Sequence, residues 1–238
     1  MTVLLFGSYP AFCTSPEKVF FKTQDGQILK ALYVKPKHGP VVIMLHGLAS
    51  GKEEWMPLVE ACEKKGWGVL AYDARGHGES STSRDQSGSP DGYKYFGRPG
   101  PGSIWEKMID DVGSAIRFLR VDQRLKNSPI VLCGASVGAN VSLNYASLTK
   151  NTKGLILLSP GLSYIEIKSS VPIMRIKNCP TLIVTSTADS YAFESSKELK
   201  KLKPSVVFWS DVKAGHGVQM FDEKLISRLV QWIENLPA

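Results

Sequence analysis

Apolar residues occur along this chain in two kinds of block. Short, nearly continuous apolar runs rich in β-branched residues are typical of strands buried on both faces of a parallel sheet. Longer segments repeat an apolar residue every three or four positions, which favours amphipathic helices. We expect strands at residues 41–45, 68–72, 130–133, 155–158, 181–184 and 206–209, and helices at 58–65, 105–120, 139–148, 194–202 and 225–233.

The first part of the chain has a different pattern. Residues 19–22 and 28–34 read as two strands, and Asp25-Gly26 between them is a hairpin turn signal. A leading hairpin followed by alternating strands and helices predicts an α/β fold, with a mostly parallel central sheet and helices on both faces. We predict a single domain over residues 19–238, preceded by an N-terminal arm at 1–18.

Residues 134–138 read Gly-Ala-Ser-Val-Gly and lie between a predicted strand and a predicted helix. At a strand-to-helix turn of this kind the flanking residues must be small, because the two backbones nearly touch. The central serine is then strained and exposed, as a nucleophile has to be. We therefore predict that Ser136 is a nucleophile; the alternative is a small-residue turn needed only for packing.

A serine hydroxyl needs a base, and the base needs an acid that orients it. Asp189 follows the predicted strand 181–184, and His216 follows 206–209. Taken singly, Asp189 could be a helix-capping loop acid and His216 an exposed loop histidine. Their order after consecutive strands matches one known arrangement of a catalytic triad. We predict the triad Ser136, Asp189 and His216.

The segment His46-Gly47-Leu48 follows the predicted central strand 41–45. In the same triad arrangement, the oxyanion hole takes one N–H from the residue after the nucleophile and a second from an early strand-to-helix loop. Val137 and Leu48 are the candidates for these two donors. The alternative is that Gly47 only permits a tight turn after the strand.

From about Val19 onward the chain resembles the α/β-hydrolase superfamily, in particular its serine esterase branch and its monoacylglycerol-lipase-like or lysophospholipase-like branches. The resemblance rests on the motifs at 46–47, 72–80 and 134–138, and on Asp189 and His216. It implies hydrolysis of carboxylic esters through an acyl-enzyme. It also implies a structural rather than catalytic role, near the oxyanion loop, for three residues of the Tyr-Asp-Ala-Arg-Gly-His-Gly-Glu-Ser motif: Asp73, Arg75 and His77.

The resemblance does not identify the ester, because this fold carries many chemistries. We expect small to medium acyl chains. A thioesterase, an amidase or a lysophospholipase with the same triad remains an alternative, as does a non-catalytic ligand-binding protein that keeps the fold.

A further question is which segment covers the predicted active site. Many members of the superfamily insert a cap domain before the acid, but here only residues 159–180 are available, so we expect no sizeable cap. Residues 81–103 are rich in Ser, Gly and Pro, and a loop of that length is either functional or disordered. We predict a small lid there, with the alternative of a solvated surface loop. The predicted substrate-pocket residues are aromatic: Tyr93, Tyr95, Phe96, Tyr164 and Tyr191.

The net charge of +7 is compatible with anionic partners, but no nucleic-acid recognition motif accompanies it. We expect a small-molecule ester as the partner, and no nucleic acid. The four cysteines form no Cys-x-x-Cys pair and the four histidines lack metal-ligand spacing, so we expect free thiols and neither a metal nor a cofactor.

No apolar stretch reaches membrane-spanning length, so we expect no stable membrane insertion. The free thiols favour a reducing, cytoplasmic location. The alternative is export, if residues 1–13 are the remnant of a secretion signal. The oligomeric state is left open by the sequence.

Overall fold

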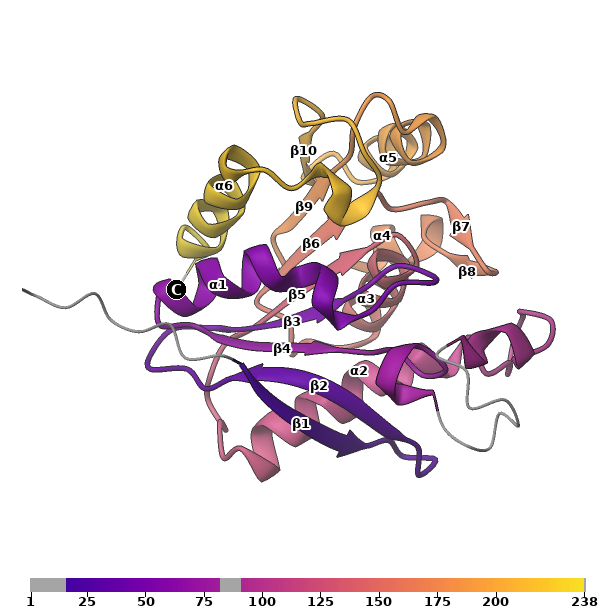
Figure 1. The fold of residues 1–238 in the computed structure, drawn as a ribbon. Helices are drawn as coiled ribbons and strands as arrows, with labels where there is room; N and C mark the ends of the chain where they lie inside the picture. The colour runs from indigo at the N-terminus through magenta and orange to yellow at the C-terminus, as the bar shows by residue number, and fades with distance from the viewer. Residues whose placement is uncertain (1–15, 82–90, 238) are drawn as a thin grey trace, which may run out of the picture.

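A computed structural model of the chain describes residues 16–81 and 91–237. An eight-stranded sheet runs through its centre in the order β1-β2-β4-β3-β5-β6-β9-β10 (Figure 1). The strands β1 and β2 form the leading antiparallel hairpin, β2 pairs antiparallel with β4, and every later pair is parallel. The eight strands are β1 (Glu17–Lys22), β2 (Ile28–Val34), β3 (Val41–Leu45), β4 (Gly68–Tyr72), β5 (Ile130–Ala135), β6 (Gly154–Leu158), β9 (Thr181–Val184) and β10 (Val207–Trp209).

Helices cover both faces of the sheet (Figure 1). The α-helices are α1 (Met56–Lys64), α2 (Lys107–Arg117), α3 (Val137–Leu148), α4 (Ser170–Arg175), α5 (Ser190–Leu202) and α6 (Glu223–Glu234). Short helical turns, η1 (Lys52–Trp55), η2 (Gly78–Ser80), η3 (Gly92–Tyr95), η4 (Phe118–Asp122) and η5 (Gly217–Met220), lie between them. The α/β-hydrolase fold with a mostly parallel sheet is thereby confirmed.

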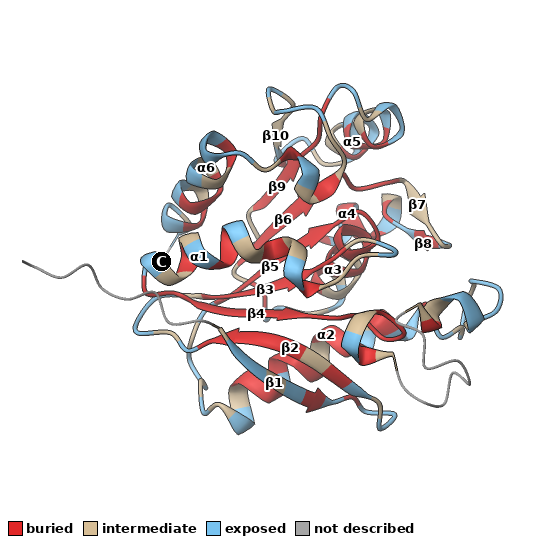
Figure 2. Ribbon diagram, in the orientation of Figure 1, coloured by how far each residue is buried: buried red, intermediate tan, exposed pale blue. Residues whose placement is uncertain are grey.

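The alternation of side chains along each strand builds two hydrophobic cores. In β3, Ile43 packs into the core beneath α2, α3, α4 and α5, whereas its neighbour Met44 packs into the core beneath α1 and α6. Figure 2 shows that the central strands are buried along their whole length. A strand buried on both faces must be apolar at every position, which is why these runs are continuous in the sequence.

The register of the sheet brings several loops to one edge. Leu45 at the end of β3 pairs with Tyr72 of β4 and with Gly134 of β5. Leu158 at the end of β6 pairs with Val184 of β9. The residues that follow these strands therefore meet at the carboxyl edge of the sheet, where ligands bind in open α/β folds.

The connector 159–180 is short and holds only a small hairpin and α4. The hairpin consists of β7 (Ser163–Tyr164) and β8 (Ile167–Lys168), and it lies at the same end of the sheet as the loops above (Figure 1). As predicted, there is no sizeable cap in this connector.

Some helices and segments begin or end at other residues than the sequence predicts. The α-helix predicted at 105–120 spans Lys107–Arg117 and continues as the π-helical turn η4. Of the predicted arm, residues 1–15 lie outside the described residues, whereas Glu17 and Lys18 belong to β1. Of the predicted lid, residues 82–90 also lie outside them.

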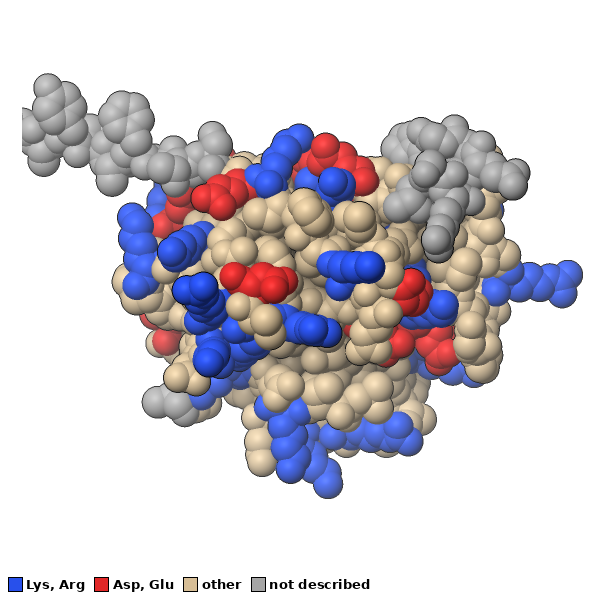
Figure 3. Space-filling view, turned by 90° about the horizontal axis from the view of Figure 1, so that it is seen from below, with Lys and Arg blue, Asp and Glu red and all other residues tan. Residues whose placement is uncertain are grey.

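Basic side chains are scattered over the surface, with acidic ones among them, on the face seen in Figure 3. The basic run on α5 is partly structural: Lys197 and Lys201 pair with Glu194 and Glu198, and Lys200 donates to the carbonyls of Pro204 and Val206. No helix within 16–81 and 91–237 has the length and apolar character needed to cross a membrane.

Candidate active site

Ser136 occupies the sharp turn between β5 and α3. Its φ of 54° and ψ of −119° place it in a region that a residue with a side chain rarely adopts. The turn is held by hydrogen bonds on both sides of the serine. Its N–H donates to the carbonyl of Leu158 at 2.8 Å, and its carbonyl accepts from Ala139 at 3.0 Å and Asn140 at 3.2 Å. The strained conformation is therefore built into the fold.

Two glycines let the turn close. A Cβ added to Gly134 would lie 2.2 Å from the carbonyl oxygen of Gly138, and a Cβ added to Gly138 would lie 2.2 Å from that of Leu45. Both contacts are with backbone that cannot move aside. Strand β5, helix α3 and strand β3 therefore come within backbone contact of one another only because these two side chains are absent.

His216 and Asp189 form a close pair beside this turn. Nδ1 of His216 lies 2.6 Å from Oδ2 of Asp189. With its proton on Nδ1, directed to the carboxylate, the imidazole has Nε2 free to accept a proton. Asp189 is anchored by its own N–H, which donates to the carbonyl of Ser186. The His216 loop is anchored by the next residue, because Gly217 donates to the hydroxyl of Ser159 at 2.9 Å.

Ser136 and His216 face the same cavity, which has a volume of about 300 Å³. Its wall also contains residues of the loop after β3, of η1, of the end of β5 and of η5: Gly47, Leu48, Ala49, Ser50, Glu54, Ala135, Gly217, Val218 and Gln219. The structure thus brings the three predicted triad residues and Leu48 to one place. Val137 follows Ser136 at the first position of α3.

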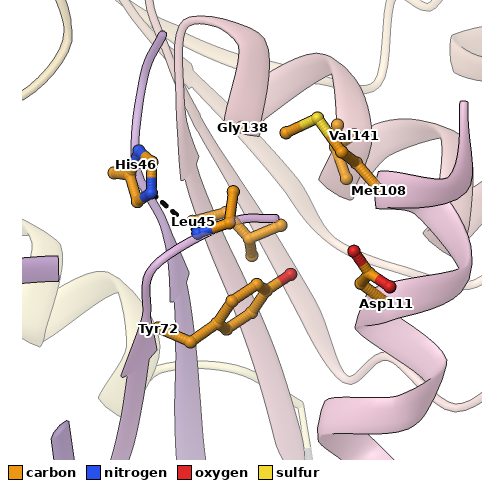
Figure 4. A pocket seen from close by; sticks show the side chains of 8 residues that line it. Leu45, His46, Tyr72, Met108, Asp111, Gly138 and Val141 are labelled. Atoms are coloured by element: carbon orange, nitrogen blue, oxygen red, sulfur yellow. Dashed lines mark hydrogen bonds between the residues drawn. The ribbon is translucent and has the colours of Figure 1, made fainter. Parts of the chain in front are cut away.

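The loop after β3 is held against Ser136 by His46. Nε2 of His46 accepts from the N–H of Ala74 at 2.9 Å, so Nδ1 carries the proton and donates to the carbonyl of Gly47 at 2.7 Å. Figure 4 shows this side chain beside a buried cavity of about 10 Å³ beneath the loop. Burial lowers the pKa of His46, which keeps the imidazole neutral. A Cβ added to Gly47 would lie 3.3 Å from Cβ of Ser136, which shows how closely the loop approaches.

The motif at 72–80 supports this loop from below. The Arg75 guanidinium, itself buried, makes two hydrogen bonds to Asp111, at 2.7 and 2.5 Å, and also bonds Asp25. His77 stacks on the ring of Tyr93, with centroids 4.3 Å apart. These contacts are with the scaffold, which agrees with the structural role that the resemblance implied.

Two of the five predicted pocket aromatics lie near the triad. The edge of Tyr164 meets the ring of His216, with centroids 6.2 Å apart, and its hydroxyl donates to the carbonyl of Ser159 at 3.3 Å. Tyr191 lies behind Tyr164, with centroids 5.5 Å apart, and its hydroxyl bonds the backbone of Ser163.

The other three aromatics are placed differently from the prediction. Phe96 packs on Trp105 with centroids 5.0 Å apart, and Tyr93 lies between His77 and Trp105. Tyr95 is 67% exposed. None of the five predicted aromatics, Tyr164 and Tyr191 included, belongs to the described wall of the Ser136 cavity. An apolar aromatic in a Gly- and Pro-rich loop gains more by burying its ring on the core than by facing water, and here the core lies below the loop.

Two polar residues near the site were missed from the sequence. Asn140, fully buried on α3, bonds Gly161 and Ile167 of the connector. Ser159, also fully buried, holds both Gly217 and Tyr164. The only sequence signal for Asn140 is an amide between apolar neighbours in a helix that also carries the nucleophile.

No group of three or more His, Cys, Asp or Glu side chains among the described residues could hold a metal ion.

Fold and site together define a protein of the α/β-hydrolase class. More particularly, the chain belongs to the hydrolase family described as serine aminopeptidase S33, whose model matches residues 36–220.

Curated relatives include a thiohydrolase and a protein phosphatase methylesterase. The chain is 30% identical over 176 residues to the thiohydrolase aneE of Aspergillus aculeatus, covering 72% of this chain and 51% of that protein. It is 28% identical over 143 residues to protein phosphatase methylesterase 1 of Candida albicans, covering 58% and 34%. The chain therefore spans about half the length, or less, of these relatives.

Solved structures share the fold over nearly the whole chain. The esterase Pf2001 of Pyrococcus furiosus matches with a TM-score of 0.74 at 23% identity, covering 93% of this chain and 92% of that one. DcsB, in complex with its substrate analogue, matches with a TM-score of 0.76 at 17% identity, covering 94% and 100%.

Proposed function

We propose that this protein is a serine hydrolase that cleaves carboxylic esters of small to medium acyl chain through an acyl-enzyme on Ser136. One observation carries the proposal: a serine in a strained strand-to-helix turn shares a cavity with His216, whose Nδ1 is held 2.6 Å from Asp189. A nucleophile, a base and an acid that orients the base are the groups that acyl transfer needs.

The position of each residue in the site determines the role that we propose for it. Neutral His216 takes the proton of the Ser136 hydroxyl at Nε2, and Oγ attacks the ester carbonyl. Asp189 stabilises the cation formed on His216. The N–H groups of Leu48 and Val137 bind the oxyanion, and the positive end of the α3 dipole, at Val137, favours the same charge. His216 then gives its proton to the departing alcohol, and water repeats the cycle on the acyl-enzyme.

The size of the cavity supports the substrate class. A volume of about 300 Å³ is at the lower end of the range of ligand pockets. Leu48 gives the wall an apolar side chain, 42% of which is exposed. Small to medium acyl groups fit such a space.

Thioesters are a second candidate class. The thiohydrolase aneE is 30% identical to this chain over 72% of its length. The proposed steps are the same for a thioester, with a thiol leaving in place of an alcohol.

The experiment compares the hydrolysis of matched esters and thioesters. The purified protein is given the acetate, butyrate, octanoate and laurate esters of p-nitrophenol, and the same acyl groups as thioesters of N-acetylcysteamine. We expect the ester series to be hydrolysed best at the shorter chains. Higher kcat/KM for every thioester than for its matched ester would favour the second class. Absence of turnover on both series, with no covalent labelling by a fluorophosphonate, would favour a non-catalytic protein.

A further inference from the structure

The loop between β3 and η1 carries Leu48, one of the two proposed oxyanion donors. Within the part of the chain that the structure describes, neither Leu48 nor Ala49 makes a backbone hydrogen bond. Ala49 also has a φ of 59°, in the left-handed region that a residue with a side chain seldom adopts. A segment with so few bonds of its own depends on its neighbours to hold an N–H group at a set position.

The carboxylate of Glu54, on η1, supplies that support. Its Oε1 accepts from the N–H of Gly47 at 3.3 Å, and its Oε2 accepts from the hydroxyl of Ser50. Hydrogen bonds to an ionised acceptor are stronger than those between neutral groups. One side chain therefore bonds both ends of the segment that contains Leu48 and Ala49.

The turn that carries Glu54 is itself fixed to the core. Lys52, two residues earlier, is buried, and its Nζ lies 2.7 Å from Oδ2 of Asp73. Trp55, the next residue, is fully buried, and its ring meets that of Phe221 with centroids 5.8 Å apart. The backbone of Glu54 lies between these two buried side chains, so the carboxylate reaches the loop from a rigid support.

The supported segment lies directly against the proposed nucleophile. A Cβ added to Gly47 would lie 3.3 Å from Cβ of Ser136, and both Leu48 and Glu54 line the cavity that Ser136 faces. An oxyanion donor works only when it lies about 2.7–3.1 Å from the oxygen that becomes charged. A small displacement of this loop is therefore enough to lose the bond.

We propose that Glu54 is a positioning residue, whose carboxylate holds the N–H of Leu48 toward the oxyanion that forms when Ser136 attacks the ester. This inference rests on the function proposed above. Glu54 exchanges no proton with the substrate and acts through its bonds to Gly47 and Ser50. The donor is then in place before the substrate arrives, so no reorganisation is needed as the charge develops.

The test compares Glu54→Ala with Glu54→Gln. Alanine removes both bonds, whereas glutamine keeps both, because its amide oxygen accepts from Gly47 and its NH₂ group donates to the Ser50 hydroxyl. With p-nitrophenyl butyrate, we expect kcat of Glu54→Ala to fall about 10- to 100-fold. KM should change little, since the oxyanion exists only after the attack. Glu54→Gln should stay within about threefold of the wild-type kcat.

A mimic of the tetrahedral intermediate tests the oxyanion site itself. Oγ of Ser136 adds to the carbonyl carbon of 1,1,1-trifluoropentan-2-one, the proton of Ser136 passes to His216, and the carbonyl π electrons become the charge on the oxyanion. The inhibition constant of this ketone should rise in Glu54→Ala by about the factor by which kcat/KM falls. A general loosening of the protein would not link these two quantities.

Two further variants serve as a graded test and a control. Ser50→Ala removes one of the two bonds and should lower kcat less than Glu54→Ala does. It also tests the proposal if Glu54→Ala does not fold, which urea unfolding would show. Glu60→Ala removes an exposed glutamate on the neighbouring helix α1 and should leave both kcat and the inhibition constant as in the wild type.

Three results would overturn the role of Glu54 while the proposed function stands. They are wild-type kcat in the folded Glu54→Ala and Ser50→Ala variants, an equal loss in Glu54→Gln and Glu54→Ala, and a change in KM alone. In each case Ser136 would still react with a fluorophosphonate. A wild-type protein that hydrolyses no ester and forms no adduct on Ser136 would overturn the proposed function itself, and the role of Glu54 with it.

Discussion

Nζ of Lys52 lies 2.7 Å from Oδ2 of Asp73, and each side chain is only 1% exposed. Asp73 also accepts from the backbone N–H of Lys52 at 2.8 Å and of Glu79 at 2.9 Å. Burial alone would lower the pKa of Lys52, but its bonds to Asp73, Glu79 and Glu53 raise that pKa above its usual value, so the ammonium stays charged. This buried pair fastens the end of the loop after β3, which carries Leu48, to the loop after β4.

Replacing Lys52 with methionine should therefore destabilise the protein strongly. The change leaves the Asp73 carboxylate buried without a cation, and breaking a buried pair in this way costs about 3–5 kcal/mol. The free energy of unfolding in urea measures the loss, and ester hydrolysis should fall with it as the loop moves. Lys18→Met is the matched control, because Lys18 pairs with Glu79 at the surface with 73% of its side chain exposed. Equal stability of the two variants would contradict a structural role for the buried pair.

Replacing Phe96 with alanine should affect stability rather than substrate choice. The ring packs on Trp105, and a Cβ added to Gly76 would lie 2.3 Å from it. Losing this half-buried ring should cost about 1–3 kcal/mol, measured by urea unfolding, with the preference among p-nitrophenyl esters unchanged. Tyr95→Ala, at an exposed position, is the control and should change neither quantity. If Phe96→Ala instead changed the chain-length preference at wild-type stability, the result would support the predicted lid at residues 81–103.

The parts of the fold that the sequence predicts best are those where local pattern and tertiary packing agree. The strands Val41–Leu45, Gly68–Tyr72 and Thr181–Val184 begin and end where predicted, because a strand buried on both faces is apolar at every position. Ser136 and Asp189 stand out because each follows such a strand, and His216 because it follows the partly exposed edge strand β10; the sheet brings the ends of these strands together.

The features that the sequence does not predict depend on contacts between distant residues. The Asn140 amide bonds Gly161, which lies 21 positions away, and Ser159 bonds Gly217 across 58 positions. The hairpin turn Ile165-Glu166 contains none of the residues that mark such turns. Phe96 has the same local pattern whether its ring faces a pocket or the core.

Stability should fall between about pH 6.5 and pH 4, in part because of His77. Burial lowers the pKa of His77 to about 4, and its Nε2 has no hydrogen-bond partner among the described residues. The unfolded chain takes a proton near pH 6.5, whereas the folded protein holds His77 neutral. The contribution of His77 to the free energy of unfolding is therefore complete above about pH 6.5, its pKa in the unfolded chain. It is lost as the pH falls toward about 4, its pKa in the folded protein, and the loss reaches up to about 3 kcal/mol.

Urea unfolding at pH 7, 6, 5 and 4.5 measures this slope (on the order of 1.4 kcal/mol per pH unit for one proton). In His77→Phe the ring can still stack on Tyr93 but cannot take a proton, so the slope in this window should be shallower than in the wild type. Identical slopes in the wild type and in His77→Phe would show that His77 does not contribute to the pH dependence of stability.

Replacing Asp189 with asparagine should lower kcat by about 10³- to 10⁴-fold with little change in KM. A neutral amide cannot stabilise the His216 cation and can hold the imidazole in the wrong tautomer. Two other aspartates near the end of the chain serve as controls. Asp211 pairs with Arg228 at the surface, and Asp222 caps α6 through Leu225. If Asp211→Asn or Asp222→Asn abolished hydrolysis and Asp189→Asn did not, the acid would be misassigned.

The proposal that Ser136 is the nucleophile has the most direct test. The folded protein is treated with a fluorophosphonate, and the adduct is mapped by tandem mass spectrometry, with Ser136→Ala as the matched variant. We predict one adduct, on Ser136, no adduct in Ser136→Ala, and a loss of at least ~10³-fold in kcat for that variant at unchanged fold. An adduct on another residue, or ester hydrolysis by Ser136→Ala at the wild-type rate, would contradict the proposed mechanism.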